Sequence, residues 1–186
     1  MQKILLALLV GSAIISPVIS HAEGSYVKFG MGESHYSGSP ASKPTGYYLA
    51  YGMQLDPSVD IEVGVVDFGR ANIGVGYEDI KGRVRTRTRS FYGAAVGSIP
   101  MSSAISLQGK LGLAVNRSSA TNASENLIAQ GYEDSSAKTN VHALIGAGLK
   151  MQFSKQVFGT LEYTRYGAAA HGHKLDMFNA ALGYQF

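Results

Sequence analysis

The chain has 186 residues, a formal net charge of +3, no cysteine, 23 glycines and 11 tyrosines. The length suits one domain, the lack of cysteine excludes disulfides and a cysteine-linked lipid anchor, and the small net charge gives no reason to expect a nucleic-acid partner. Beyond residue 22, no apolar run approaches the roughly 20 residues of a membrane-spanning helix.

The first 22 residues have the pattern of an export signal. Lys3 precedes a nearly continuous apolar run from Ile4 to Ile19, and Ser20 and Ala22 place small residues where a signal peptidase reads the chain. We therefore expect a signal peptide at residues 1–22 and a single mature domain at residues 23–186.

Period-2 alternation of apolar and polar residues runs through the mature domain. It predicts eight strands, at residues 25–34, 47–55, 59–69, 90–99, 104–116, 141–153, 157–163 and 175–186. Three connections are short turns, at residues 56–58, 100–102 and 154–156, and four are longer or polar, at residues 35–44, 70–84, 117–137 and 167–173. This strict alternation is typical of a membrane barrel with short periplasmic turns and longer extracellular loops. The sequence thus predicts an all-β protein, an eight-stranded antiparallel up-and-down transmembrane β-barrel.

Charged residues recur on the strand face opposite to the apolar one, and we expect them to form a network in the lumen: Lys28, Glu62, Lys110, Lys150 and Glu162. Gln54, Gln108 and Gln152 would complete its hydrogen bonds. A soluble lipocalin-like barrel is the alternative, but it needs an apolar interior. Turning the charges to lipid would cost about 2–4 kcal/mol for each basic residue near the midplane. A polar plug is the favoured interpretation, and a narrow gated path is the alternative.

Four arginines alternate along the chain before the fourth strand, at Arg83, Arg85, Arg87 and Arg89. In an extended strand they share one side, and guanidinium groups suit phosphate and sulfate. We place Tyr92, Ala94 and Val96 against lipid, so the odd-numbered arginines would lean over the barrel mouth and contact lipopolysaccharide phosphates or sulfated glycans. The alternative is a solvated rim that pairs with Glu78 and Asp79.

Three segments resemble the OmpA-type barrels and their small relatives, such as OmpX and the opacity proteins. They are LDPSVDIEVGVVDFG (residues 55–69), GTLEYTRYG (159–167) and the final LGYQF (182–186). The resemblance implies a Gram-negative outer-membrane location and a charged lumen network that includes Glu62, Lys110 and Glu162. Thr160 and Ala95 stand where such barrels can carry basic residues. It also implies that Tyr184 and Phe186, on the apolar face of the last strand, act as a signal for the barrel-assembly machinery.

These features favour a structural or surface-interaction role through the extracellular loops. The expected partners are outer-membrane lipid and lipopolysaccharide, the assembly machinery, and host or envelope molecules; we expect a monomer. A small gated pore is the alternative. A lipid A-modifying enzyme is less favoured, because His171, His173 and Asp176 lie near the rim without a His-x-Ser pair on a strand. We therefore expect no enzyme, no cofactor and no metal site.

Overall fold

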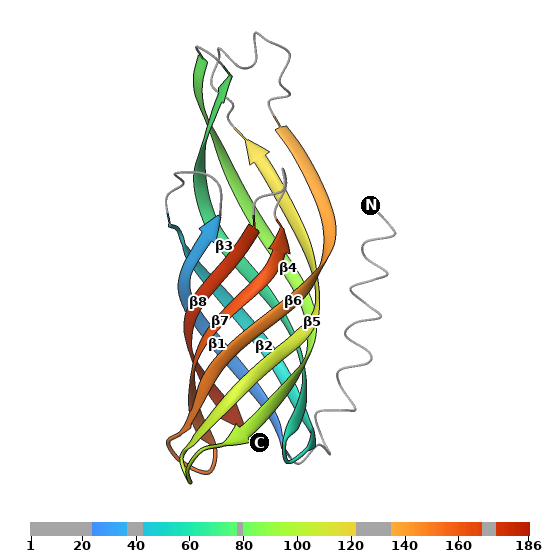
Figure 1. Ribbon diagram of the computed structural model, residues 1–186, viewed down its shortest axis with the longest axis vertical. Coiled ribbons are helices and arrows are strands. Elements are labelled where there is room, and N and C mark those ends of the chain that lie inside the picture. Colours follow the sequence, from blue (N-terminus) through green and yellow to red (C-terminus); the bar gives the residue numbers. More distant parts are fainter. Residues whose placement is uncertain (1–23, 37–42, 78–79, 122–134, 169–173) are drawn as a thin grey trace.

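A computed structural model describes residues 24–36, 43–77, 80–121, 135–168 and 174–186. Eight antiparallel strands form a closed barrel in which each strand pairs with the next and β1 pairs with β8 (Figure 1). The strands are β1 (Ser25–Tyr36), β2 (Thr45–Asp56), β3 (Val59–Tyr77), β4 (Ile80–Pro100), β5 (Ile105–Thr121), β6 (Ser135–Gln152), β7 (Val157–Ala168) and β8 (Lys174–Gln185). The predicted eight-stranded up-and-down barrel is confirmed, whereas the predicted signal peptide lies outside the described residues.

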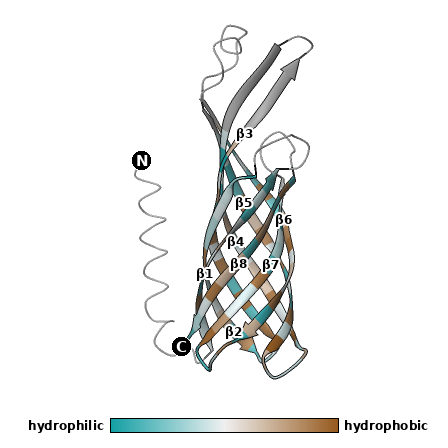
Figure 2. Cartoon of the chain, turned by 90° about the vertical axis from the view of Figure 1, so that its left-hand side faces the viewer, coloured by the Kyte–Doolittle hydropathy of each residue, from teal (hydrophilic) through white to brown (hydrophobic). Residues whose placement is uncertain are grey.

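The outer wall of the barrel is largely apolar, and hydrophobic (brown) and hydrophilic (teal) positions alternate along the strands (Figure 2). Phe29, Leu49, Val65, Leu111 and Ile145 are each at least half exposed on this wall. Their sequence neighbours point inward and are mostly buried, because successive side chains of a strand leave opposite faces. Within the described residues, no helix is both long enough and apolar enough to cross a membrane.

The predicted facing of the fourth strand is wrong. Tyr92, Ala94 and Val96 are buried inside the barrel, and Phe91 and Ala95 lie on the outer wall. The prediction treated Tyr92 as an apolar lipid-facing residue and its small neighbours as lumen residues. The hydroxyl group of Tyr92 instead donates a hydrogen bond to a carboxylate inside the barrel. Small residues are tolerated on the outer wall, because no other part of the protein packs against them.

Two of the predicted loops are partly strand. Residues 70–84 were expected to form a loop, but β3 and β4 continue as a paired hairpin as far as Tyr77 and Ile80. This hairpin projects beyond the other strands at the end away from the chain's C-terminus (Figure 1). A loop was also expected at residues 117–137. Strand β5 extends into this segment as far as Thr121, and β6 begins within it at Ser135. The rest of the segment lies outside the described residues.

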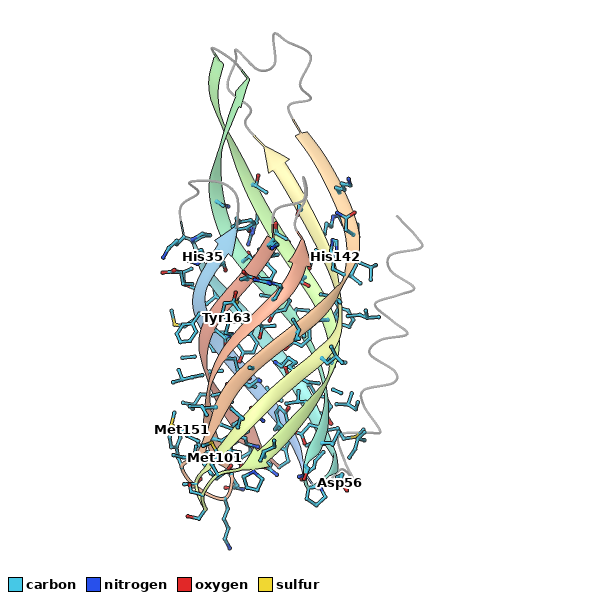
Figure 3. The ribbon with its side chains drawn as sticks, viewed as in Figure 1. His35, Asp56, Met101, His142, Met151 and Tyr163 are labelled. Atoms are coloured by element: carbon cyan, nitrogen blue, oxygen red, sulfur yellow. The ribbon has the colours of Figure 1, made fainter. Side chains whose placement is uncertain are left out.

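The two ends of the barrel differ. Asp56, Met101 and Met151 mark the end with short turns, and His35 and His142 mark the opposite end (Figure 3). Phe186 lies at the short-turn end, where its N–H donates to the carbonyl oxygen of Ser25 at 2.8 Å. The predicted short turns are present, with β2 and β3 joined through Pro57 and Ser58. This end corresponds to the periplasmic side of a membrane barrel.

Candidate functional site

Four charged side chains meet at the centre of the lumen, and each comes from an odd-numbered strand. Lys28 Nζ lies 2.9 Å from Glu62 Oε2 and 2.6 Å from Glu162 Oε1. Lys110 Nζ lies 2.7 Å from Glu62 Oε1 and 2.9 Å from Glu162 Oε2. The two lysines and two glutamates therefore form a closed ring, which we call the quartet. Inward residues of alternate strands often share one layer of a barrel in this way.

The quartet is sealed from water and fully engaged in polar contacts. Its side chains are at most 5% exposed. The hydroxyl groups of Tyr26 and Tyr92 donate to the two oxygens of Glu62, at 3.0 Å and 2.7 Å. Burial of an unpaired charge costs several kcal/mol, so two positive and two negative groups in mutual contact are the arrangement that a closed lumen requires.

The fifth residue of the predicted network, Lys150, lies apart from this ring. Its Nζ is 4.3 Å from the ring centroid of Phe158 and 5.7 Å from that of Tyr26. It lines a polar hollow of about 170 Å³ at the short-turn end, together with Asp60 and Gln152. Among the described residues, no carboxylate oxygen lies within ion-pair distance of Lys150.

Two of the three predicted glutamines, and one of the two positions compared with basic residues, also differ from expectation. Gln108 donates to Ser98 Oγ at 3.0 Å, and Gln152 donates to the Ser154 carbonyl oxygen at 2.7 Å, so neither contacts the quartet. Thr160 is buried in the lumen. Ala95 faces outward, so it does not occupy the lumen position that the resemblance implies.

An aromatic and aliphatic layer fills the lumen between the quartet and the hairpin end. Its buried members include Tyr36, Tyr48, Phe68, Leu144, Tyr166, Leu175 and Met177. The Tyr166 ring centroid lies 5.0 Å from that of Phe68 and 5.8 Å from that of Tyr92, both in edge-to-face geometry. This layer was not predicted, because the inward positions were interpreted only through their charged, amide and small residues. The alternation along the strand does indicate it, because Tyr166 has the same parity as the inward residues Thr160 and Glu162.

Two of the four predicted arginines, Arg87 and Arg89, lie on the outer wall and not over the mouth. Arg87 and Arg89 both bind the Asp67 carboxylate, with Arg87 Nε at 3.1 Å and Arg89 Nε at 3.2 Å from Oδ2. Their outward position follows from the corrected facing of β4. Arg83 and Arg85 belong to the β4 backbone, but their side chains lie outside the described residues, as do Glu78 and Asp79.

Two further arginines complete this surface and were not predicted. Arg117 on β5 is directly opposite Arg89, and Arg70 on β3 is directly opposite Arg87. Both arginines are exposed. We call Arg70, Arg87, Arg89 and Arg117 the arginine collar. Arg70 and Arg117 lie in segments that are predicted to be loops, so their neighbours on adjacent strands could not be predicted.

A local bulge orients Asp67 toward the collar. The β3–β4 register shifts between Asp67 and Arg70, where Gly69 adopts a φ of 75°. A Cβ at this position would lie 2.5 Å from the Thr45 carbonyl oxygen, so the site requires glycine. The Gly69 N–H donates to Asp67 Oδ1 at 3.1 Å, which fixes the carboxylate.

On the opposite side of the rim, Asp176 is engaged by an arginine. Arg165 donates from Nε to Asp176 Oδ1 at 2.7 Å and from Nη2 to Oδ2 at 3.1 Å. The enzyme candidates His171 and His173 lie outside the described residues. Among the residues that are described, no group of three or more His, Cys, Asp or Glu side chains could hold a metal ion.

Comparison with known proteins agrees with this geometry. The family model for the outer membrane protein beta-barrel domain matches residues 4–186. The chain belongs to this family. As a member of the outer membrane β-barrel family, it is a protein of the Gram-negative outer membrane, so its apolar wall faces lipid and its hairpin end faces the cell exterior. No curated protein matches the chain.

Several solved outer-membrane barrels share the fold. OprG from Pseudomonas aeruginosa is 13% identical with a TM-score of 0.62, and covers 89% of this chain and 97% of its own. Neisserial surface protein A is 14% identical with a TM-score of 0.58, covering 87% and 97%. Ail, the attachment invasion locus protein of Yersinia pestis, is 15% identical with a TM-score of 0.55, covering 88% and 97%. At these identities the similarity shows the fold alone.

Proposed function

We propose that this barrel acts at the cell surface, through the part that extends beyond the outer leaflet. The observation that carries the proposal is the length of β3 and β4, which have 19 and 21 residues. A tilted strand needs only roughly 9 to 11 residues to cross a bilayer. About half of each strand is therefore available to hold a paired hairpin outside the membrane, where it can contact other molecules.

The arginines of this hairpin suggest the chemistry of its partners. Arg83, Arg85, Arg87 and Arg89 alternate along β4, and guanidinium groups bind phosphate and sulfate well. Ail, which shares the fold, has been crystallised in complex with the heparin analogue sucrose octasulfate. We propose lipopolysaccharide phosphates and anionic envelope or host molecules as partners of this rim.

The remaining predictions complete the proposal. Residues 1–22 act as a signal peptide, and residues 23–186 form the mature barrel, which is a monomer. The rings of Tyr184 and Phe186 lie outward on the last segment in edge-to-face contact at 5.5 Å. We propose that these two side chains are read by the barrel-assembly machinery.

Shortening the hairpin tests the proposed surface role. Residues 73–84 are replaced by Asn-Gly, which suits a two-residue β-hairpin. A variant with residues 73–84 in scrambled order keeps the length and composition and serves as the control for sequence. We expect bacteria that display the shortened barrel to attach less to cultured epithelial cells, or to lose resistance to vancomycin and detergent, at equal surface amount. Unchanged attachment and unchanged resistance would overturn the proposal.

A gated pore is the second candidate function, and the polar hollow near Lys150 is the observation that favours it. Water can enter this hollow from the periplasmic end. The quartet and the aromatic and aliphatic layer above it then block the path, so the surface role is better supported. We propose no enzymatic activity for this barrel.

A further inference from the structure

A shallow hollow of about 660 Å³ lies on the outer wall, below the arginine collar. Its lining is largely apolar and spans several strands, and includes Phe29, Leu49, Val65, Phe91, Val115 and Tyr47. Arg89, Arg117 and Asp67 line the same hollow. A second hollow of about 420 Å³, lined by Arg87, Arg89, Arg117 and Ser119, shares two of these arginines. Apolar surface and guanidinium groups therefore meet where the lipid-facing wall ends.

The collar carries more positive charge than its own carboxylate can neutralise. Arg89 faces Arg117 across the β4–β5 pair, and like charges directly opposite one another on adjacent strands are destabilising. Asp67 is shared between Arg87 and Arg89. Within the described part of the chain, no carboxylate oxygen lies at ion-pair distance from Arg117. An external anion between Arg89 and Arg117 would relieve this repulsion.

We propose that this surface is a binding site for a phosphorylated, multiply acylated lipid of the outer leaflet, with lipid A chemistry. The phosphate lies between Arg89 and Arg117, and acyl chains cover the hollow beside Phe91, Val115 and Val65. The inference deepens the proposed contact with lipopolysaccharide and rests on it. It differs in placing the ligand on the lateral wall and in assigning a role to Arg117.

A lipid fits this surface better than a soluble polyanion does. Phe91 and Val115 are the next outward residues below Arg89 and Arg117 on their strands, and both are exposed. A soluble sulfated sugar could satisfy the arginines but would leave these side chains uncovered. A membrane lipid brings its phosphate and its chains together at the height where the wall changes from apolar to charged.

Lipid retention by the purified, folded barrel tests the site. The protein is refolded in a detergent with a sugar headgroup, and binding of diphosphorylated lipid A is measured by native mass spectrometry. Lipid A without phosphates, phosphatidylglycerol and sucrose octasulfate are the comparison ligands. The variant Arg89→Gln/Arg117→Gln is paired with Lys138→Gln/Lys174→Gln, which removes the same charge from other exposed positions.

We expect the arginine variant to bind diphosphorylated lipid A about tenfold more weakly or worse, because hydrogen bonds to charged groups are lost. The lysine variant should bind within about twofold of the wild type. Wild-type protein should prefer diphosphorylated lipid A to the other three ligands. Equal binding by wild type and arginine variant, or equal binding of lipid A without phosphates, would overturn the proposal. Preferential binding of phosphatidylglycerol or sucrose octasulfate would also overturn it, by identifying a different ligand.

The single variant Arg117→Gln provides a second readout if the double variant does not fold. Without lipid, its unfolding temperature should equal or exceed that of the wild type, because a like-charge contact is removed. Added lipid A should stabilise the wild type more than the variant, since a ligand stabilises the state that binds it. A lower unfolding temperature without lipid would show a purely structural role for Arg117. These measurements use purified protein, so their failure is distinguishable from a failure of cell attachment.

Discussion

Glu62 is the residue on which the lumen contacts converge. Its two carboxylate oxygens meet both quartet lysines and both tyrosine hydroxyls, and its side chain has no exposed surface. Loss of its charge leaves two buried ammonium groups with one carboxylate between them. Removal of one partner from a buried ion pair is far more damaging than its replacement as a whole, because the remaining charge stays desolvated.

We expect Glu62→Gln to lower the free energy of unfolding by about 3–5 kcal/mol. The measurement is urea unfolding of the barrel in lipid vesicles, followed by its heat-shifted migration on gels. Glu33→Gln is the control, because Glu33 pairs with Lys43 at 3.0 Å at an exposed site, where the loss should stay below about 1 kcal/mol. Equal unfolding midpoints for the two variants would contradict the structural importance of the quartet.

The sequence indicated which charged residues point inward, but it did not indicate which of them meet. Parity along a strand assigns Lys28, Glu62, Lys110, Lys150 and Glu162 to the lumen. Their heights depend on the stagger between strands, which no single strand encodes. For this reason Lys150 could not be separated from the quartet before the register was known.

Strand β4 shows where alternation alone is ambiguous. Both of its faces carry small and apolar residues between Ser90 and Ile99, so the pattern does not identify the lumen face. Pairing decides it: Glu62 is opposite Ala94, and directly opposite residues of a strand pair share a face. The corrected facing also places Arg87 and Arg89 on the outer wall. A single error in the predicted facing of β4 therefore put these two arginines on the wrong side of the barrel.

Cysteine labelling tests the facing of β4 without background, since the chain has no cysteine. Ala95→Cys should react with a lipid-soluble maleimide in the folded barrel, because Ala95 lies on the outer wall. Ala94→Cys should stay unreactive until unfolding, because Ala94 is only 6% exposed, inside the barrel. Mass spectrometry measures both reactions. Reversed reactivity would restore the original assignment of lumen and lipid faces.

The length of the hairpin could not be predicted from the composition of its residues. Residues 70–84 contain charged residues and glycines, which favour a loop prediction, yet Ile73 and Val75 alternate with small or polar neighbours. Pairing of β3 with β4 continues through this segment to Tyr77 and Ile80. Strands were predicted correctly within the membrane, because their lipid-facing residues must be apolar. The strands were missed beyond the membrane, because residues exposed to water need not be apolar.

The barrel is closed laterally by β1–β8 pairing, and side chains close its interior along the barrel axis. The quartet occupies one layer, and the cluster with Tyr48, Phe68 and Tyr166 occupies the next layer toward the exterior. An ion on this path would have to displace paired charges and then pass a layer that is filled by buried aromatic side chains. An eight-stranded barrel leaves little interior space beyond its side chains.

We therefore expect the refolded wild-type barrel to give no steady channels in a planar bilayer. Heat-shifted migration of the same sample confirms folding, and an established porin in the same bilayer shows that channels are detectable. Steady wild-type channels that change in Glu62→Ala or Lys110→Ala would contradict this expectation and make the quartet a gate. Silence from folded protein would leave the quartet as a stabilising plug, because a sealed lumen cannot carry solutes. The hairpin and the arginine collar would then be the surfaces through which this barrel acts.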